Sequence, residues 1–226
     1  IVLLKPGTNI YINSGGKLRI KECEGASTPT IFMSERENTP WGGFIVHGIN
    51  SHLDATHTIF LWSGGANLNK HDKNNYEKNY GLGHRTEIPL LTIGSDANVR
   101  LTHSQLIYGS GQAIVAATGA KLYINFTLVK GFTCGLQCNN ATINIINSVF
   151  TDYPTRETRT NNILNYEDSD HDAMYIVGGN VSILKSAVGN AMDDCVDSGS
   201  GPGGILNIKD TFVQSCYHEG IALSDN

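Results

Sequence analysis

Apolar and polar residues alternate in short runs along most of the chain, and these runs recur at a nearly constant distance. In the regular part, the leading apolar residues of the runs are Val99, Leu122, Ile143, Val181 and Leu206. The steps between them are 122 − 99 = 23, 143 − 122 = 21, 181 − 143 = 38 and 206 − 181 = 25 residues. Alternation with a period of two is typical of β-strands, and a fixed repeat is typical of stacked units that bury one face on their neighbours.

The pattern predicts an all-β fold, a right-handed parallel β-helix with coils of about 21–25 residues. No segment shows the period of 3.6 residues expected inside a helical repeat, and the Leu-x-x-Leu-x-Leu skeleton of leucine-rich repeats is absent. We expect residues 1–226 to form a single domain, truncated at its C-terminal end. Because the sequence begins at Ile1 without Met, we expect a monomer that belongs to a longer multidomain chain.

Two inserted loops are predicted to leave this regular array. The single outsized step of 38 residues places one insertion at residues 153–169. Residues 64–89 are rich in Asn, Lys, Tyr and Gly and follow neither a strand period nor a helix period, so they predict the second loop. Long loops of this kind are often functional.

Composition limits the kinds of partner. The formal net charge is −5, which argues against nucleic acid and anionic membranes, because such partners are held by clusters of Lys and Arg. No window of eighteen apolar residues occurs, so we expect no membrane insertion. A neutral or cationic ligand remains open on this charge.

Cysteine usage favours an extracellular or cell-surface location. Cys195 and Cys216 are one coil apart, 216 − 195 = 21 residues, and Cys134 and Cys138 are close in sequence, so two disulfides are plausible and Cys23 is left over. Paired cysteines are typical of oxidising compartments. Glycosylation sequons point the same way, and they begin at Asn125, Asn140 and Asn180.

Acidic residues and a histidine fall into one column when the coils are superimposed. A shift of 25 residues places Asp193 under His218 and Asp194 under Glu219, and a shift of 21 places Asp172 under Asp193. The same shift of 21 places Tyr175 under Val196, so the expected ladder is Asp172, Asp193 and His218.

The expected ladder has dimensions suited to glycoside hydrolysis. Stacked strands lie about 4.7–4.9 Å apart, so carboxyls on adjacent and next-but-one coils bracket the roughly 6.5–9.5 Å that an inverting hydrolase requires. Carboxylates held this close do not all ionise, so one is expected to keep its proton near neutral pH and to serve as a general acid beside a general base.

Other interpretations of these residues remain open. Stacked polar residues also form purely structural ladders in such folds, and carboxylates can bind Ca²⁺. We assign no metal ligands and expect no cofactor, with Ca²⁺ as the one candidate ion. Residues 197–204 are rich in Asp, Ser, Gly and Pro and are expected to form a turn.

The motifs around this column resemble those of polygalacturonases, β-helix enzymes that hydrolyse pectin. The matching segments are Asp170-His171-Asp172, Met192-Asp193-Asp194-Cys195 and Cys216-Tyr217-His218-Glu219-Gly220. The resemblance implies that Asp193 is the general acid, that Asp172 and Asp194 position the attacking water, and that His218 tunes the acid. It also implies a bridge between Cys195 and Cys216.

Within the matched motifs, the chain departs from the family pattern. Asp170 replaces Asn, Met192 replaces Gly, Glu219 replaces Gly, and no Arg-x-Lys follows the His motif. We take Asp170, His171 and Glu219 as candidate substrate-binding residues, and Asp172, Asp193, Asp194 and His218 as candidate catalytic residues.

Two further resemblances concern the fold and an alternative function. The segment Trp41-Gly42-Gly43-Phe44-Ile45 resembles the entry coils of secreted right-handed parallel β-helices of the pectin-lyase type. The longer C-terminal stretch, residues 173–222, resembles β-helix segments of bacterial surface proteins associated with spore-coat-protein-H kinase-like domains. The alternative function is therefore a non-catalytic cell-surface module that binds a polysaccharide or a protein partner.

Overall fold

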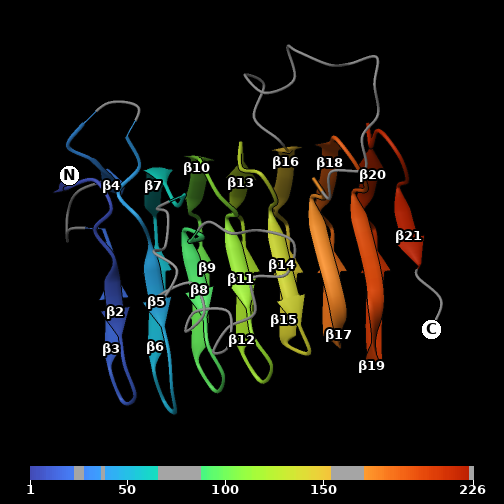
Figure 1. Ribbon diagram of the computed structural model, residues 1–226, viewed down its shortest axis with the longest axis horizontal. Helices are drawn as coiled ribbons and strands as arrows, with labels where there is room; N and C mark the ends of the chain where they lie inside the picture. Colours follow the sequence, from blue (N-terminus) through green and yellow to red (C-terminus); the bar gives the residue numbers. More distant parts are fainter. Residues whose placement is uncertain (23–27, 37–38, 66–87, 154–170, 224–226) are drawn as a thin grey trace, which may run out of the picture.

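Parallel strands and the turns between them form the described part of the protein. The computed structural model describes residues 1–22, 28–36, 39–65, 88–153 and 171–223 (Figure 1). Within these residues there are strands but no helices, and so no helix that is long and apolar enough to cross a membrane. The expectation of an all-β protein is confirmed.

One sheet has eight strands in the order β1-β4-β7-β10-β13-β16-β18-β20. Its strands are β1 (Val2–Leu4), β4 (Thr30–Ser34), β7 (Thr58–Ser63), β10 (Gln105–Gly109), β13 (Leu128–Lys130), β16 (Val149–Tyr153), β18 (Ala187–Ala191) and β20 (Phe212–Gln214).

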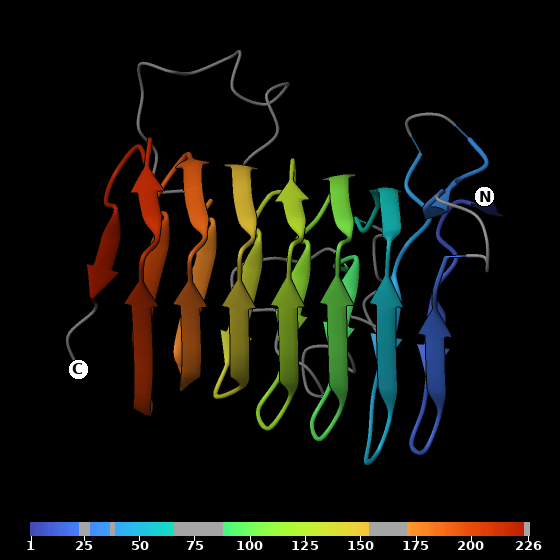
Figure 2. The same ribbon diagram turned by 180° about the vertical axis from the view of Figure 1, so that it is seen from behind.

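The other sheet has thirteen strands and consists of two arms joined by β17 and β19. The front arm contains β2 (Ile10–Ile12), β5 (Phe44–Val46), β8 (Leu91–Ile93), β11 (Ile114–Ala116), β14 (Leu136–Asn139), the first halves of β17 (Met174–Leu184) and β19 (Val196–Lys209), and β21 (Ile221–Leu223). The back arm contains β3 (Lys17–Ile20), β6 (His52–Thr56), β9 (Asn98–Thr102), β12 (Lys121–Asn125), β15 (Thr142–Ile146) and the second halves of β17 and β19. Figure 2 looks onto the back arm.

Strand pairing follows the repeat that the sequence predicts. As far as β14, each strand pairs in parallel with the strand three places later in the chain. Leu122 pairs with both Val99 and Ile143, and Val181 pairs with both Ile143 and Leu206. The first four of these side chains are at most 2% exposed. The predicted inward face is therefore confirmed, and the chain returns to the same place after every three strands.

The predicted insertions lie largely outside the described residues. At these two places the paired strands are far apart in the chain, because Phe44 pairs with Leu91, 47 residues later, and Ile143 pairs with Val181, 38 residues later. The described chain stops at Gly65 and resumes at Ile88 around the first insertion. For the second insertion, only Tyr153 is described; it ends β16 and is fully buried.

The predicted turn at residues 197–204 is wrong, because this stretch belongs to strand β19. Val177 pairs with Gly199, whereas Gly179 pairs with Gly204, so β19 accommodates three additional residues over this interval. The Gly-rich composition permits this irregularity without ending the strand, since glycines can approach the neighbouring backbone closely. A Cβ on Gly204 would lie 2.8 Å from the carbonyl oxygen of Gly179.

A buried column of hydroxyl groups marks the corner where the back arm leads into the eight-stranded sheet. Each hydroxyl residue follows a residue in the left-handed backbone region, with φ between 48° and 52° for His103, Phe126, Asn147, Lys185 and Asp210. We call this group the hydroxyl column, and its members are Thr58, Ser104, Thr127, Ser148, Ser186 and Thr211.

Hydrogen bonds in the hydroxyl column repeat from one level to the next. Ser148 Oγ accepts a bond from the Thr127 N–H at 3.1 Å and donates to the Ile146 carbonyl at 2.7 Å. Ser186 Oγ does the same for the Ser148 N–H at 3.1 Å and the Leu184 carbonyl at 2.8 Å. The corner therefore satisfies backbone groups that the sheets leave unpaired, as buried polar groups require.

Candidate functional site

Three stacked turns, each leading into a front-arm strand, carry the predicted site residues. Asp172 precedes β17, and Asp193 and Asp194 lie between β18 and β19. His218 and Glu219 lie between β20 and β21. The His218 N–H donates a hydrogen bond to the Asp193 carbonyl at 3.2 Å, which confirms the predicted stacking of these two residues.

The register one level earlier differs by one residue from the prediction. Met174 pairs with Val196, so the step is 196 − 174 = 22 residues, and Tyr175 pairs with Asp197 rather than with Val196. Met174 and Val196 are both fully buried. They must therefore share the inward face, because a slip of one residue would send every side chain to the opposite face.

As a consequence, Asp172 stacks on Asp194 and not on Asp193. The Ala173 N–H donates to the Asp194 carbonyl at 3.0 Å. The Asp194 N–H in turn donates to Asp172 Oδ1 at 3.2 Å. The ladder is thus composed of Asp172 and Asp194, while Asp193 occupies the neighbouring position beneath His218.

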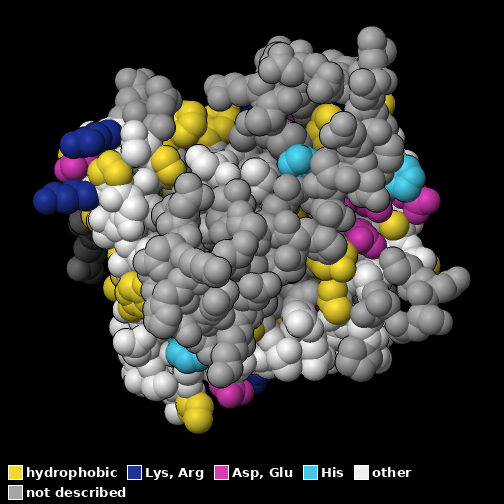
Figure 3. All heavy atoms as spheres, viewed as in Figure 1, with side chains coloured by type: hydrophobic (Ala, Val, Ile, Leu, Met, Phe, Trp, Pro, Cys, Tyr) yellow, Lys and Arg dark blue, Asp and Glu magenta, His cyan; other side chains and the backbone are white. Residues whose placement is uncertain are grey.

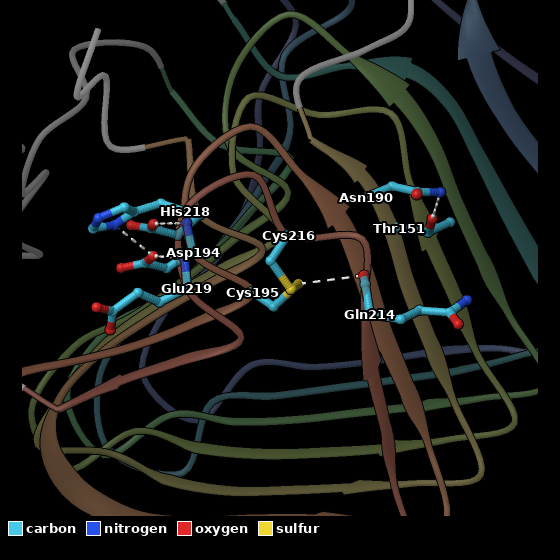
Figure 4. Close-up of a disulfide and its surroundings, with 9 residues drawn as sticks. Thr151, Asn190, Asp194, Cys195, Gln214, Cys216, His218 and Glu219 are labelled. Atoms are coloured by element: carbon cyan, nitrogen blue, oxygen red, sulfur yellow. Dashed lines mark hydrogen bonds and ion pairs between the residues drawn. A yellow bond between two sulfur atoms is a disulfide. The ribbon is translucent and has the colours of Figure 1, made fainter. Parts of the chain in front are cut away.

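Asp194 is the centre of this cluster (Figure 4). Its Oδ1 accepts a hydrogen bond from the Glu219 N–H at 2.7 Å and lies 3.1 Å from His218 Nδ1. The Asp193 carboxylate lies 3.7 Å from the same nitrogen. His218 therefore contacts both carboxylates, and it balances one negative charge when its imidazole is protonated.

Burial differs sharply within the cluster. Asp172, Asp193 and Asp194 are 3%, 4% and 7% exposed, whereas the His218 side chain is half exposed. Figure 3 shows acidic and histidine side chains gathered on the surface beside the turns at the C-terminal end of the array. Solvent and ligand therefore reach the cluster from the His218 side.

Burial also raises the pKa of Asp172 from its ordinary value of 3.8 to about 8. Loss of solvation is the main cause, and the charges of Asp193, Asp197 and Asp194 add to it, while the hydrogen bond from the Asp194 backbone opposes it. Asp172 is consequently a neutral acid at pH 7. The expectation that a proton is retained among these carboxyls agrees with this shift, and the proton resides on Asp172.

A cation could also be held at the exposed side of the cluster. One ligand atom each from Asp193, Asp194 and His218 lie within 4.8 Å of one another. Ca²⁺ takes six to eight oxygen ligands, and this set offers two carboxylates and a nitrogen. The set is therefore closer to the mixed nitrogen and oxygen ligands of transition metals.

A disulfide fixes two of the three turns relative to each other. Cys195 and Cys216 are bonded, with Cα atoms 5.4 Å apart, as the spacing of one coil predicts. Cys195 directly follows Asp194, and Cys216 lies two residues before His218. The bridge therefore holds the two acidic residues and the histidine in a common frame (Figure 4).

The second disulfide considered, between Cys134 and Cys138, does not form. Both cysteines are buried thiols. Cys138 belongs to the extended strand β14 and Cys134 lies just before it. The Cys138 pKa is raised to about 12 by burial, so this thiol is not reactive.

The remaining predicted residues have different outcomes. Asp170 lies outside the described residues. His171 is partly buried and lies next to Asp172, and Glu219 is exposed. The Glu219 backbone takes part in the cluster through its bond to Asp194.

Sequence reasoning missed the polar and aromatic residues near the same margin of the array. Asn190 Nδ2 donates to Thr151 Oγ1 and to Asp152 Oδ1, each at 3.1 Å. Two or more levels away, the rings of Trp62 and Tyr108 stack with centroids 5.3 Å apart. The signal in the sequence was weak, because these residues share a left-handed backbone and not a residue type.

Comparison with protein-family models, with curated proteins and with solved structures returns no match. The class defined by the structure is therefore an all-β protein of stacked parallel strands with a buried acidic cluster and a disulfide. The polygalacturonase-like motifs and the likeness to bacterial surface β-helices contribute only to the proposals that follow.

Proposed function

We propose that this protein is a right-handed parallel β-helix that acts on an extracellular polysaccharide as an inverting glycoside hydrolase. The three-strand repeat and the exclusively parallel pairing support the fold. The observation that carries the function is the convergence of Asp193, Asp194 and His218 within 4.8 Å, backed by a neutral Asp172. Protonated and ionised acids side by side support acid–base cleavage of a glycosidic bond. The ligand atoms lie closer together than the roughly 6.5–9.5 Å typical of inverting enzymes, so the inverting outcome rests on the polygalacturonase-like motifs and not on this distance.

The proposed reaction is a single displacement. The proposal requires a second proton in the cluster, on Asp193, which donates it to the glycosidic oxygen as the bond to the anomeric carbon breaks. A water attacks that carbon from the opposite face and passes a proton to Asp194, so that the configuration is inverted. Asp172 is neutral at pH 7, and its role is to help orient the water and Asp194 and not to serve as the base. His218 adjusts the acidity of Asp193 from 3.7 Å away.

Location and assembly follow from the same proposal. The Cys195–Cys216 disulfide is compatible with an extracellular or cell-surface protein. We propose that the chain works as a monomeric part of a longer protein. The substrate-binding roles of Asp170, His171 and Glu219 and the predicted loops at 64–89 and 153–169 as walls of a groove belong to this proposal.

The test is turnover of soluble polysaccharides, with polygalacturonate, alginate, β-glucan and arabinoxylan as the panel and release of reducing ends as the measurement. Asp193→Asn should lower turnover by about 10²–10⁴-fold, since it removes a proton donor and little volume. Binding, measured by affinity electrophoresis, should stay unchanged. Asp210→Asn is the matched control, because it makes the same change between β19 and β20, at the corner of the hydroxyl column, and should keep full activity.

Unchanged turnover in Asp193→Asn would refute the role of this residue. Absence of turnover over the whole panel in the unaltered protein would refute the hydrolase. Neither outcome depends on the fold, because circular dichroism and thermal unfolding of the variants are measured alongside.

The competing proposal is a non-catalytic cell-surface module. It is favoured by one observation: the carboxylates of Asp172 and Asp194 accept backbone N–H groups, as structural side chains do. Under this proposal, polysaccharide binding occurs without cleavage, and Asp193→Asn alters neither.

A further inference from the structure

A separate surface with reversed charge lies on the back arm, away from the acidic cluster. Side chains alternate along these strands, so that Leu18, Val99 and Leu122 point inward. Five outward residues of β3, β9 and β12, counting the residue that follows β3, are basic and exposed. We call them the basic face, and they are Lys17, Arg19, Lys21, Arg100 and Lys121.

The charge of this face is opposite to that of the whole protein. The chain carries 21 acidic and 16 basic residues, a net charge of −5. Among the outward residues of β3, β6, β9 and β12 the structure describes one acid, Asp54, and Glu22 lies at the edge. Five cations against two acids leave a local charge of +3. This segregation favours an anionic partner, because complementary fields steer and hold such ligands.

Two cations of the basic face, Arg19 and Arg100, are oriented by neighbouring side chains, and Arg19 and Lys21 border a hollow. Arg19 Nε lies 3.5 Å from Asp54 Oδ2, and the Arg100 guanidinium lies 4.8 Å above the Tyr123 ring. A hollow of about 560 Å³ is lined by Arg19, Lys21, Glu22, Asp54 and Thr56. A ligand thus meets both a concave region and charged groups whose positions are restrained.

The spacing of the cations follows the strand ladder. Lys17, His52, Asn98 and Lys121 occupy one line across four paired strands. At about 4.7–4.9 Å per strand, Lys17 and Lys121 are roughly 14 Å apart along the stacking direction. Arg19 and Arg100 flank Asp54 in the neighbouring line. An elongated polyanion that runs across the strands can therefore contact several cations at once.

We infer that the basic face binds a carboxylated polysaccharide, such as a polyuronate, at a site distinct from the acidic cluster. Between the cations stand amide and hydroxyl side chains, among them Asn98 and Thr56, which can hydrogen-bond sugar hydroxyls. Double-stranded DNA carries one charge per about 1.7 Å, and a protein of net charge −5 repels so dense a polyanion. A carboxylated sugar chain has a lower charge density and suits this mixed surface better.

The inference does not depend on hydrolysis, and it is tested on the Asp193→Asn protein so that the polymer stays intact. Polygalacturonate and alginate are the probes, with neutral β-glucan for comparison, and affinity electrophoresis gives Kd. The double variant Lys17→Gln/Lys121→Gln should raise Kd by roughly three- to tenfold. Raising the NaCl concentration to about 1 M should have a similar effect, because the screening length falls to about 3 Å.

The matched control is Lys185→Gln/Lys209→Gln, which removes two exposed charges at the far end of the same side and should leave Kd unchanged. Equal effects of the two double variants would overturn the inference, since only total charge would then matter. So would binding of β-glucan as tight as that of polygalacturonate. A preference for a single-stranded oligonucleotide over both uronates would assign the face to nucleic acid instead. Absence of turnover in the unaltered protein, with uronate binding retained, would refute the hydrolase and leave the basic face in place.

Discussion

The hydroxyl column and the acidic cluster are both polar, both buried and both stacked along the array, yet they are built on opposite principles. In the hydroxyl column, Ser148 and Ser186 make the same two hydrogen bonds at successive levels. The acidic cluster also repeats a bond, because Asp172 Oδ1 accepts the Asp194 N–H and Asp194 Oδ1 accepts the Glu219 N–H. The first region stacks neutral groups, whereas the second uses the same stacking to gather ionisable ones.

The two regions also differ in what it costs to bury their polar groups side by side. A hydroxyl can donate and accept at once, so each member of the column satisfies its neighbours without charge. Carboxylates placed together lose solvation and repel each other, and Asp172 keeps a proton as a result. An arrangement that disfavours its own charged state is hard to explain by stability alone. Perturbed acids of this kind are typical of functional sites.

The largest loss of stability is expected from a substitution in the hydrophobic core that both regions share. Ile183 is fully buried on β17 and leads into Ser186 of the hydroxyl column. Ile183→Ala should lower the free energy of unfolding by about 2–5 kcal/mol, and Ile183→Val by about 0.5–1.5 kcal/mol. Urea denaturation measures both. Equal stabilities of the two variants would contradict the inward position of this side chain.

Removing the disulfide should loosen the acidic cluster and leave the hydroxyl column unchanged. Cys195→Ala/Cys216→Ala opens a bridge across 21 residues and should cost about 2–4 kcal/mol. Amide hydrogen exchange should become faster at Glu219 and His218, which follow Cys216, and stay unchanged at Ser148. Faster exchange at Ser148 as well would show that the hydroxyl column depends on the bridge.

Removal of a single hydroxyl from the column should lower stability more than the small volume of the group suggests. Ser148→Ala leaves the buried Thr127 N–H without its acceptor, at a cost of about 1–3 kcal/mol. Ser182→Ala removes an outward hydroxyl on the same arm and should change stability by less than about 0.5 kcal/mol. Thermal and urea unfolding compare the two variants, and equal losses would deny the column its structural role.

The smallest effect, per unit of pH, is a change in how steeply the free energy of unfolding varies with pH. It distinguishes the acidic cluster from the hydroxyl column. The pKa of Asp172 is about 8 in the folded protein against an ordinary value of 3.8. The folded state therefore holds a proton that the unfolded chain releases, and stability falls as pH rises from about 4 to about 8, by up to about 1.4 kcal/mol per unit.

Asp172→Asn lacks this proton, so its stability relative to the unaltered protein should increase by up to about 1.4 kcal/mol between about pH 6 and pH 7. Urea denaturation at the two pH values measures the difference. Ser148→Ala, which removes no titratable group, should instead run parallel to the unaltered protein. A parallel curve for Asp172→Asn would show that this carboxyl is ionised at pH 7.

The sequence by itself determined the repeat and its inward face. Val99, Leu122, Ile143 and Val181 pair in the predicted order, because parallel strands must bury the same alternate positions at every level. The Cys195–Cys216 bridge followed from the same spacing. The stacking of His218 on Asp193 was also predictable, since the apolar residues on both sides of it, Val188 with Val213 and Val196 with Ile221, share one shift.

Only the tertiary structure decided the chemistry of the cluster. The level of Asp172 follows the insertion, where no constant step remains, so the correct partner, Asp194, emerges from the pairing of Met174 with Val196. The proton on Asp172 depends on burial by groups far away in the chain. The hydroxyl column was visible only as scattered Ser and Thr residues, since a hydrogen-bonding role is set by the neighbours that the fold brings together. Repetition is written in the sequence because it is local to each level, whereas solvation and charge are properties of the assembled stack.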